Sequence, residues 1–173
     1  MSEVDEHAHA APEEDRLADI YDAEGVIRGG FVAEVEDAIS IGDREALREK
    51  VGSLHESEVG DLIEALPPEQ RRQLVELMGG DFDFAALTEV DEAIRLDIVD
   101  NLPNAQIAQA VQEMDSDDAV YILEDLDQQD RDEILAQLPF TERIRLRRAL
   151  DYPEETAGRR MQTEFVAVPS FWT

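Results

Sequence analysis

The 173-residue chain contains no cysteine, which excludes disulfides, thiolate metal sites and a cysteine nucleophile. Aromatic residues make up only 6% of the chain and Gly and Pro are few, so Leu, Ile, Val and Ala must do the packing. No run of 18 apolar residues occurs, so no segment of this sequence predicts a membrane-spanning helix. Residues 1–15 lack the apolar core of a secretory signal, and we therefore expect the cytoplasm.

Basic residues are also scarce, and Lys50 is the only lysine. The chain has 43 acidic against 15 basic residues, a net charge of -28. Such a balance argues against binding to nucleic acid or to an anionic membrane, because phosphates would be repelled. Two interpretations of the charge remain open. It serves solubility or adaptation to a salty cytoplasm, or it forms a surface that meets cations.

The most informative stretch is Asp115–Leu138, which predicts two short helices joined by a tight turn. Its first half has apolar residues at the helical spacing i, i+3, i+4 and i+7: Ala119, Ile122, Leu123 and Leu126. Asp127 follows as the expected N-cap of the second helix, since its carboxylate can accept from free amides of the first turn. Pro139 then ends that helix.

The same pattern recurs along the chain. Leu66, Leu102, Leu126 and Leu138 are 36, 24 and 12 residues apart, all multiples of 12. A period of about 12 is one three-turn helix and a turn, so about 24 residues make a helix pair. Helices this short need stacking partners, which predicts an all-α, armadillo-like solenoid of short antiparallel helices. We expect a superhelix of either hand over residues 31–150.

The flanking segments differ from this array. Residues 1–15 are expected to be a disordered acidic tail, and 15–28 a weak helix. In the middle, Phe82 and Phe84 are expected to anchor the core. At the other end, Phe165–Val168 predicts a short strand without a partner, which resembles the first strand of a further domain.

No catalytic motif is present, so we do not expect an enzyme. One acidic cluster stands out: Asp115, Asp117 and Asp118 crowd the start of a helix. They are explained either by helix capping or by a metal site. One carboxylate would suffice as a cap. Two charges about 4 Å apart repel by about 1 kcal/mol in water, and a divalent cation would relieve that repulsion.

Three stretches of the chain resemble a known family, the MgtE-type magnesium transporters, and the middle one, the helices through Asp127–Leu138, follows the same pattern. Phe31–Met78 resembles the opening helices of their intracellular N-terminal domain through Gly42–Asp43, Leu54–His55 and Asp61–Glu69. Tyr152–Pro169 resembles the junction between that domain and the first CBS domain, usually written T-A-G-x-L-M-T.

This chain departs from the family pattern at three positions. Arg160 stands where the family usually has an apolar residue, and Gln162 stands where it has Thr. The resemblance assigns Asp117 to a magnesium site between domains, but the second acid of that site is Tyr121 here. Either the site is weakened, or Asp118 takes over the missing role.

The resemblance implies a tail (1–15), the helical N domain (16–158) and the beginning of a truncated CBS domain (159–173). It also implies a homodimeric transporter, with this domain on the cytoplasmic face of the inner membrane and not itself inserted. Its partners would be the CBS domains of the same transporter, and Mg²⁺ between the cytosolic domains would hold the pore closed. The expected function is therefore magnesium sensing. The alternative is a solenoid scaffold for protein interaction without a metal role, which continuation into CBS and transmembrane segments would argue against.

Overall fold

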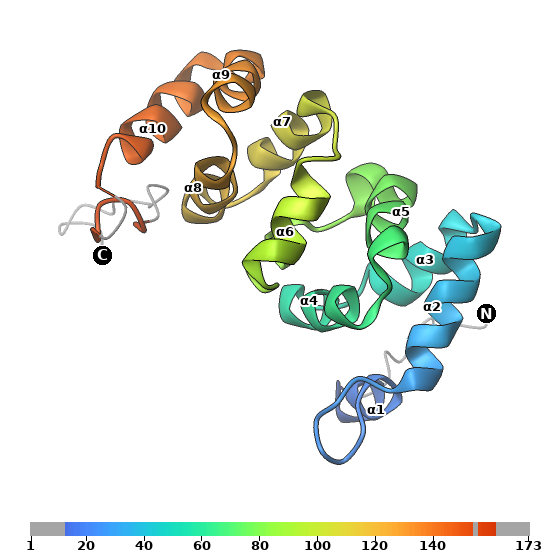
Figure 1. Ribbon diagram of the computed structural model, residues 1–173. Coiled ribbons are helices and arrows are strands. Elements are labelled where there is room, and N and C mark those ends of the chain that lie inside the picture. Colours follow the sequence, from blue (N-terminus) through green and yellow to red (C-terminus); the bar gives the residue numbers. More distant parts are fainter. Residues whose placement is uncertain (1–12, 154–155, 162–173) are drawn as a thin grey trace, which may run out of the picture.

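The computed structural model describes residues 13–153 and 156–161, and there it is built from short helices (Figure 1). The elements are α1 (Glu13–Ile20), α2 (Gly29–Ile41), α3 (Arg44–Val51), α4 (Glu56–Ala65), α5 (Pro68–Met78), the 3₁₀ helices η1 (Gly79–Asp81) and η2 (Phe84–Thr88), α6 (Glu92–Val99), α7 (Asn104–Glu113), α8 (Ser116–Asp125), α9 (Gln128–Gln137) and α10 (Phe140–Leu150). The described residues form no strand, only an isolated bridge between Tyr21 and Ile27. The all-α prediction is confirmed.

Three of the periodic leucines lie where one helix ends and the chain turns into the next, and we call these three the leucine joints. Leu66, Leu126 and Leu138 each cap the end of a helix in an extended conformation, with φ near -75° and ψ near 150°. At most 6% of each of these leucines is exposed, so each fills the core where the chain changes direction. Two of the three precede a proline, which favours the extended conformation at the residue before it.

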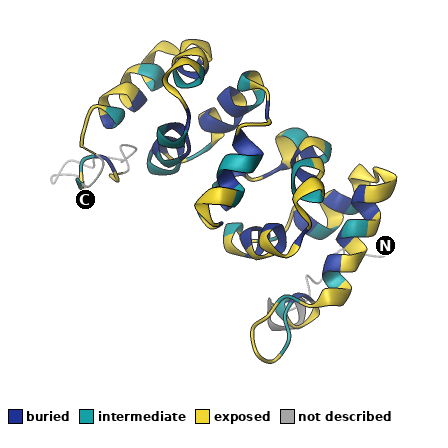
Figure 2. Ribbon diagram, viewed as in Figure 1, coloured by how far each residue is buried: buried dark blue, intermediate teal, exposed yellow. Residues whose placement is uncertain are grey.

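The helices follow one another along an arc from α1 to α10 (Figure 1). In the C-terminal half the most extensive contacts join α7 to α9 and α8 to α10, so the packing partner is the next helix but one. The consecutive pair inferred from the period of 24 is therefore not the main packing unit there. Buried residues line these contacts and exposed residues cover the outer faces (Figure 2).

The N-terminal expectations were less accurate. Helix α1 already begins at Glu13, inside the expected tail, and it ends at Ile20 rather than continuing to Arg28. The chain then turns back, because the Asp22 carboxylate accepts from the amides of Glu24 and Val26. The remainder of the tail and the expected strand Phe165–Val168 lie outside the described residues.

The middle of the chain follows the prediction more closely. Phe82 and Phe84 are about 5% exposed, and their rings meet edge to face with centroids 5.2 Å apart. The two rings lie close to where η1 ends and η2 begins. Helix η2 packs against both α4 and α8. No helix among the described residues has the length and apolarity that a membrane crossing requires.

Candidate metal centre

The start of α8 holds the three carboxylates that the sequence singles out. Asp115 is the N-cap residue, and Asp117 and Asp118 lie in the first turn. The Asp115 side chain makes no capping hydrogen bond there. At the next helix, by contrast, Asp127 caps α9 as predicted, and its carboxylate accepts from the amide of Asp130 at 2.9 Å. Asp115 therefore does not act as a side-chain cap, while Asp117 and Asp118 lie in the first turn, where the helix dipole favours acids.

The three side chains converge on one point. One carboxylate oxygen from each of Asp115, Asp117 and Asp118 lies within 4.8 Å of the others. Asp115 is exposed, and the other two are half-buried. Opposite ligands of a magnesium ion are about 4 Å apart, given metal–oxygen bonds of about 2.1 Å.

Asp117 also has a carboxylate oxygen without a hydrogen-bond partner among the described residues. Oδ1 of Asp117 is buried and accepts no hydrogen bond from the described residues. A buried carboxylate oxygen without a donor is costly, since nothing replaces the water it has lost. A cation at the cluster would bring positive charge to this carboxylate, and the three acids fit a hard divalent ion that prefers oxygen ligands.

The electrostatic surroundings of Asp118 are unfavourable to its charge. Partial burial raises the pKa of Asp118 from 3.8 to about 6, and like charges nearby add to the shift. In decreasing order these neighbours are Asp117, Glu56, Asp115 and Glu89. At neutral pH Asp118 is still ionised, so the free site holds charges that repel one another.

Two of these neighbours come from distant parts of the chain. Glu56 lies in the first turn of α4, and Glu89 caps the end of η2. Gly60 permits this arrangement, since a Cβ at Gly60 would lie 2.9 Å from the Cβ of Glu89. The start of α4 is itself fixed by a capping box, in which the amide of His55 donates to the Glu58 carboxylate at 2.8 Å. Packing therefore adds negative charge around the α8 cluster.

Tyr121, one turn after Asp117, is engaged with arginines. The guanidinium of Arg95 lies 4.4 Å from the centroid of the Tyr121 ring, and that of Arg160 lies 4.9 Å from it. Arg95 is buried and its Nε donates to Asp125 at 2.5 Å. The sequence offered one signal for this network: Arg95 precedes the buried Ile98 and Val99 by three and four residues, so it lies on the apolar face of α6.

Fold and site together define a superhelical all-α domain with a convergent carboxylate cluster at the start of one helix. The chain belongs to the family of the MgtE intracellular N domain, whose model matches residues 54–155. This confirms the resemblance seen in the sequence.

A solved structure supports the same assignment. The chain is similar to the crystal structure of the soluble part of a magnesium transporter, with a TM-score of 0.64 and 25% sequence identity. The match covers 79% of this chain and 54% of that one, so this chain spans about half the length of the structure it resembles. No curated protein matches the chain.

Proposed function

We propose that this domain senses cytosolic Mg²⁺ and regulates the pore of a magnesium transporter. The observation that carries the proposal is the convergence of the Asp115, Asp117 and Asp118 carboxylates, one of which, Asp117, has a buried oxygen without a donor among the described residues. Membership in the MgtE N-domain family and similarity to the soluble part of a magnesium transporter supply the context. In this proposal the domain lies on the cytoplasmic face of the membrane and belongs to a homodimer.

The proposed regulation depends on the negative charge at the start of α8. Without magnesium, the ionised acids at the start of α8 repel one another and any acidic surface that approaches them. Asp115, Asp117 and Asp118 would hold a Mg²⁺ ion, which would supply the positive charge that offsets this repulsion and lets a neighbouring acidic domain approach. We assign that neighbour to the CBS domains of the same transporter. High magnesium then favours a docked arrangement and a closed pore, and low magnesium releases it.

The expected affinity is weak, as a sensor of free magnesium requires. A dissociation constant of about 1 mM corresponds to roughly 4 kcal/mol. Two or three carboxylates with water completing an octahedral shell suit such a value, because Mg²⁺ gives up its hydration water reluctantly. This domain alone supplies only part of the ligand set, so it should bind more weakly than the complete cytosolic region.

A magnesium titration by calorimetry in about 0.15 M KCl tests the site, because the salt screens diffuse attraction to the net negative charge. The variant Asp117→Asn should weaken the residual binding of this chain. Asp100→Asn is the matched control, because Asp100 is an exposed acid at the end of α6 and loses the same charge. Equal titration curves for the two variants would show that Asp117 does not contribute to magnesium binding.

The regulatory part requires a longer chain that includes CBS domains. Magnesium should make that chain more compact and slow its proteolysis, and Asp117→Asn should reduce both effects. Protease sensitivity that is the same with and without magnesium would refute sensing. The scaffold function would then be the better account of the fold.

A further inference from the structure

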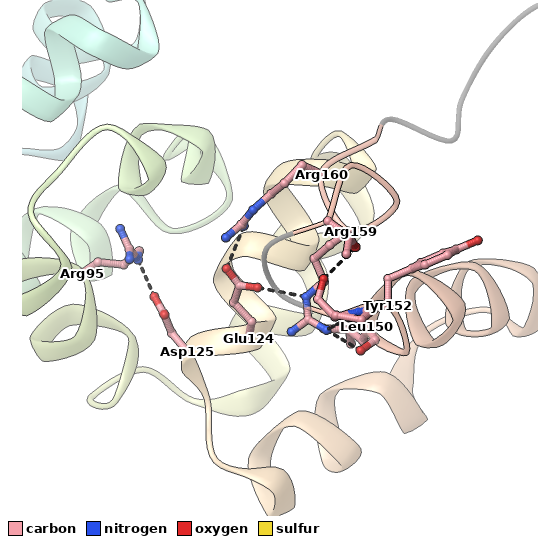
Figure 3. Close-up of polar contacts among 9 residues, drawn as sticks. Arg95, Glu124, Asp125, Leu150, Tyr152, Arg159 and Arg160 are labelled. Carbon is pink, nitrogen blue, oxygen red and sulfur yellow. Dashed lines mark hydrogen bonds and ion pairs between the residues drawn. The ribbon is translucent and has the colours of Figure 1, made fainter.

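Glu124, near the end of α8, is contacted by two consecutive arginines from the turn that follows α10 (Figure 3). Nε of Arg159 lies 3.1 Å from one of its carboxylate oxygens, and a terminal nitrogen of Arg160 lies 2.7 Å from the other. The Glu124 side chain is 13% exposed and that of Arg159 6%, so this ion pair is shielded from water, whereas the Arg160 side chain is 45% exposed. One carboxylate therefore receives both positive charges of the turn.

Arg159 also ties the turn to α10. Its guanidinium donates to the carbonyl oxygens of Leu150 and Tyr152, the latter at 3.0 Å (Figure 3). The residue is only 5% exposed. A buried guanidinium needs a carboxylate partner, because its charge is otherwise uncompensated. Glu124 supplies that charge among the described residues, so the position of Arg159 depends on it.

Arg160 extends the contact toward α6. Its guanidinium lies over the ring of Tyr121, which precedes Glu124 by three residues and so shares its side of α8. Arg95 of α6 lies over the same ring and pairs with Asp125. The turn is thus held at a point where α6, α8 and the end of α10 already meet.

We propose that residues 156–161 form an ionic latch that closes on Glu124 and fixes the direction in which the chain leaves this domain. The cation that closes the latch is a guanidinium of the chain itself, so the latch does not depend on the proposed metal site. It nevertheless acts on the same helix, since Asp117 and Glu124 are seven residues apart, about 10 Å along α8. The turn 156–161 is therefore held by the same helix that begins with the acidic cluster.

Hydrogen exchange of this chain in EDTA tests the latch without any contribution from metal. The probes are the amides of Arg159 and Arg160, which donate to the carbonyls of Thr156 and Ala157 at 3.0 and 3.2 Å. Exchange reports how often these turn bonds open. The variant E124Q keeps the size of the side chain but removes the charge, and it should speed exchange at both amides at least tenfold. Arg160→Gln removes one of the two ion pairs and should give a smaller increase, about threefold.

Asp117→Asn is the matched control, because it removes one charge from the same helix outside the latch. It should leave exchange at residues 159 and 160 within twofold of the parent chain, although it weakens magnesium binding under the proposed function. The latch is refuted if E124Q leaves exchange within twofold, or if D117N accelerates it as much as E124Q. If circular dichroism shows that E124Q is unfolded, Arg160→Gln becomes the deciding variant. Unchanged exchange at residues 159 and 160 in Arg160→Gln would then overturn the proposal.

Discussion

Arg95 of α6 and Asp125 of α8 form an ion pair in which the arginine side chain is 4% exposed and the carboxylate side chain 16%. The Nε of Arg95 donates to Asp125 at 2.5 Å, and a terminal nitrogen donates to the carbonyl of Val90. Thirty residues separate the two partners in the sequence. The pair therefore links α6 directly to α8, two helices that are not consecutive in the chain.

Removing one partner of this pair should be strongly destabilising. Asp125→Asn leaves the buried guanidinium of Arg95 without a counter-charge, and we expect a loss of about 3 kcal/mol in the free energy of unfolding. Urea denaturation measures it. The control is Asp132→Asn, which removes an exposed partner 3.7 Å from Arg147 and should cost less than about 0.5 kcal/mol. Equal losses would show that burial of the Arg95 pair is unimportant.

Leu123 tests the packing of α8. Its side chain is 0% exposed and belongs to the core. Leu123→Ala should reduce the free energy of unfolding by about 3 kcal/mol, within the usual range of about 2–5 kcal/mol for such truncations. Chemical denaturation followed by circular dichroism gives the value. A change within experimental error would mean that the Leu123 side chain does not contribute to the core.

Asp118 should destabilise the metal-free domain at neutral pH. Its folded-state pKa is raised, so the folded chain binds more protons than the unfolded chain between about pH 4 and pH 6. Stability from this group is therefore lost as the pH rises through that window. Asp118→Asn should stabilise the metal-free chain at pH 7.5 by about 1 kcal/mol, the size of one such repulsion in water.

The pH dependence of that gain is the check. Thermal unfolding in EDTA should show the two chains equally stable near pH 4 and different at pH 7.5. Comparing them at each pH cancels acids that do not interact with Asp118 and leaves its burial and its repulsion by Asp117, Glu56, Asp115 and Glu89. A gain that is the same at both pH values would exclude the raised pKa as its cause.

Gly42 should be needed for its backbone conformation. It ends α2 with φ 69°, in the left-handed region, where its amide satisfies carbonyls of the last turn. Gly42→Ala should cost about 1 kcal/mol in unfolding free energy, because a Cβ is unfavourable at this φ. Gly29→Ala is the control, since Gly29 begins the same helix and a Cβ there meets nothing within 4 Å. Thermal melts should show Gly29→Ala to be neutral or slightly stabilising.

The sequence predicts those structural features that depend only on residues close together in the chain. The two short helices expected over Asp115–Leu138 are α8 and α9, with Asp127 between them and Pro139 after the second, because apolar stripes, caps and prolines act locally. The acidic cluster was visible because its three members lie within four positions of one another. Whether it binds magnesium stays a prediction.

Features set by packing were not predictable in the same way. The contributions of Glu56 and Glu89 to the cluster depend on how α4 and η2 meet α8. Tyr121 and Arg160 were each noticed as departures from the family pattern, but their contact was not, because 39 positions separate them. The return of the chain after Ile20 was missed because Asp22 provides a turn that helical spacing does not reveal.

The leucine joints also restrict how this chain can change in length during evolution. Between α8 and α9, and between α9 and α10, only two residues separate one helix from the next, and the first of them is a buried leucine. An inserted residue within a helix rotates everything after it by about 100° and would turn the next leucine out of the core. Because packing joins each helix to the next but one, the loss of a single 12-residue unit would also exchange packing partners. Insertions and deletions in this part of the chain should therefore be tolerated in steps of about 24 residues, a whole pair of helices at a time.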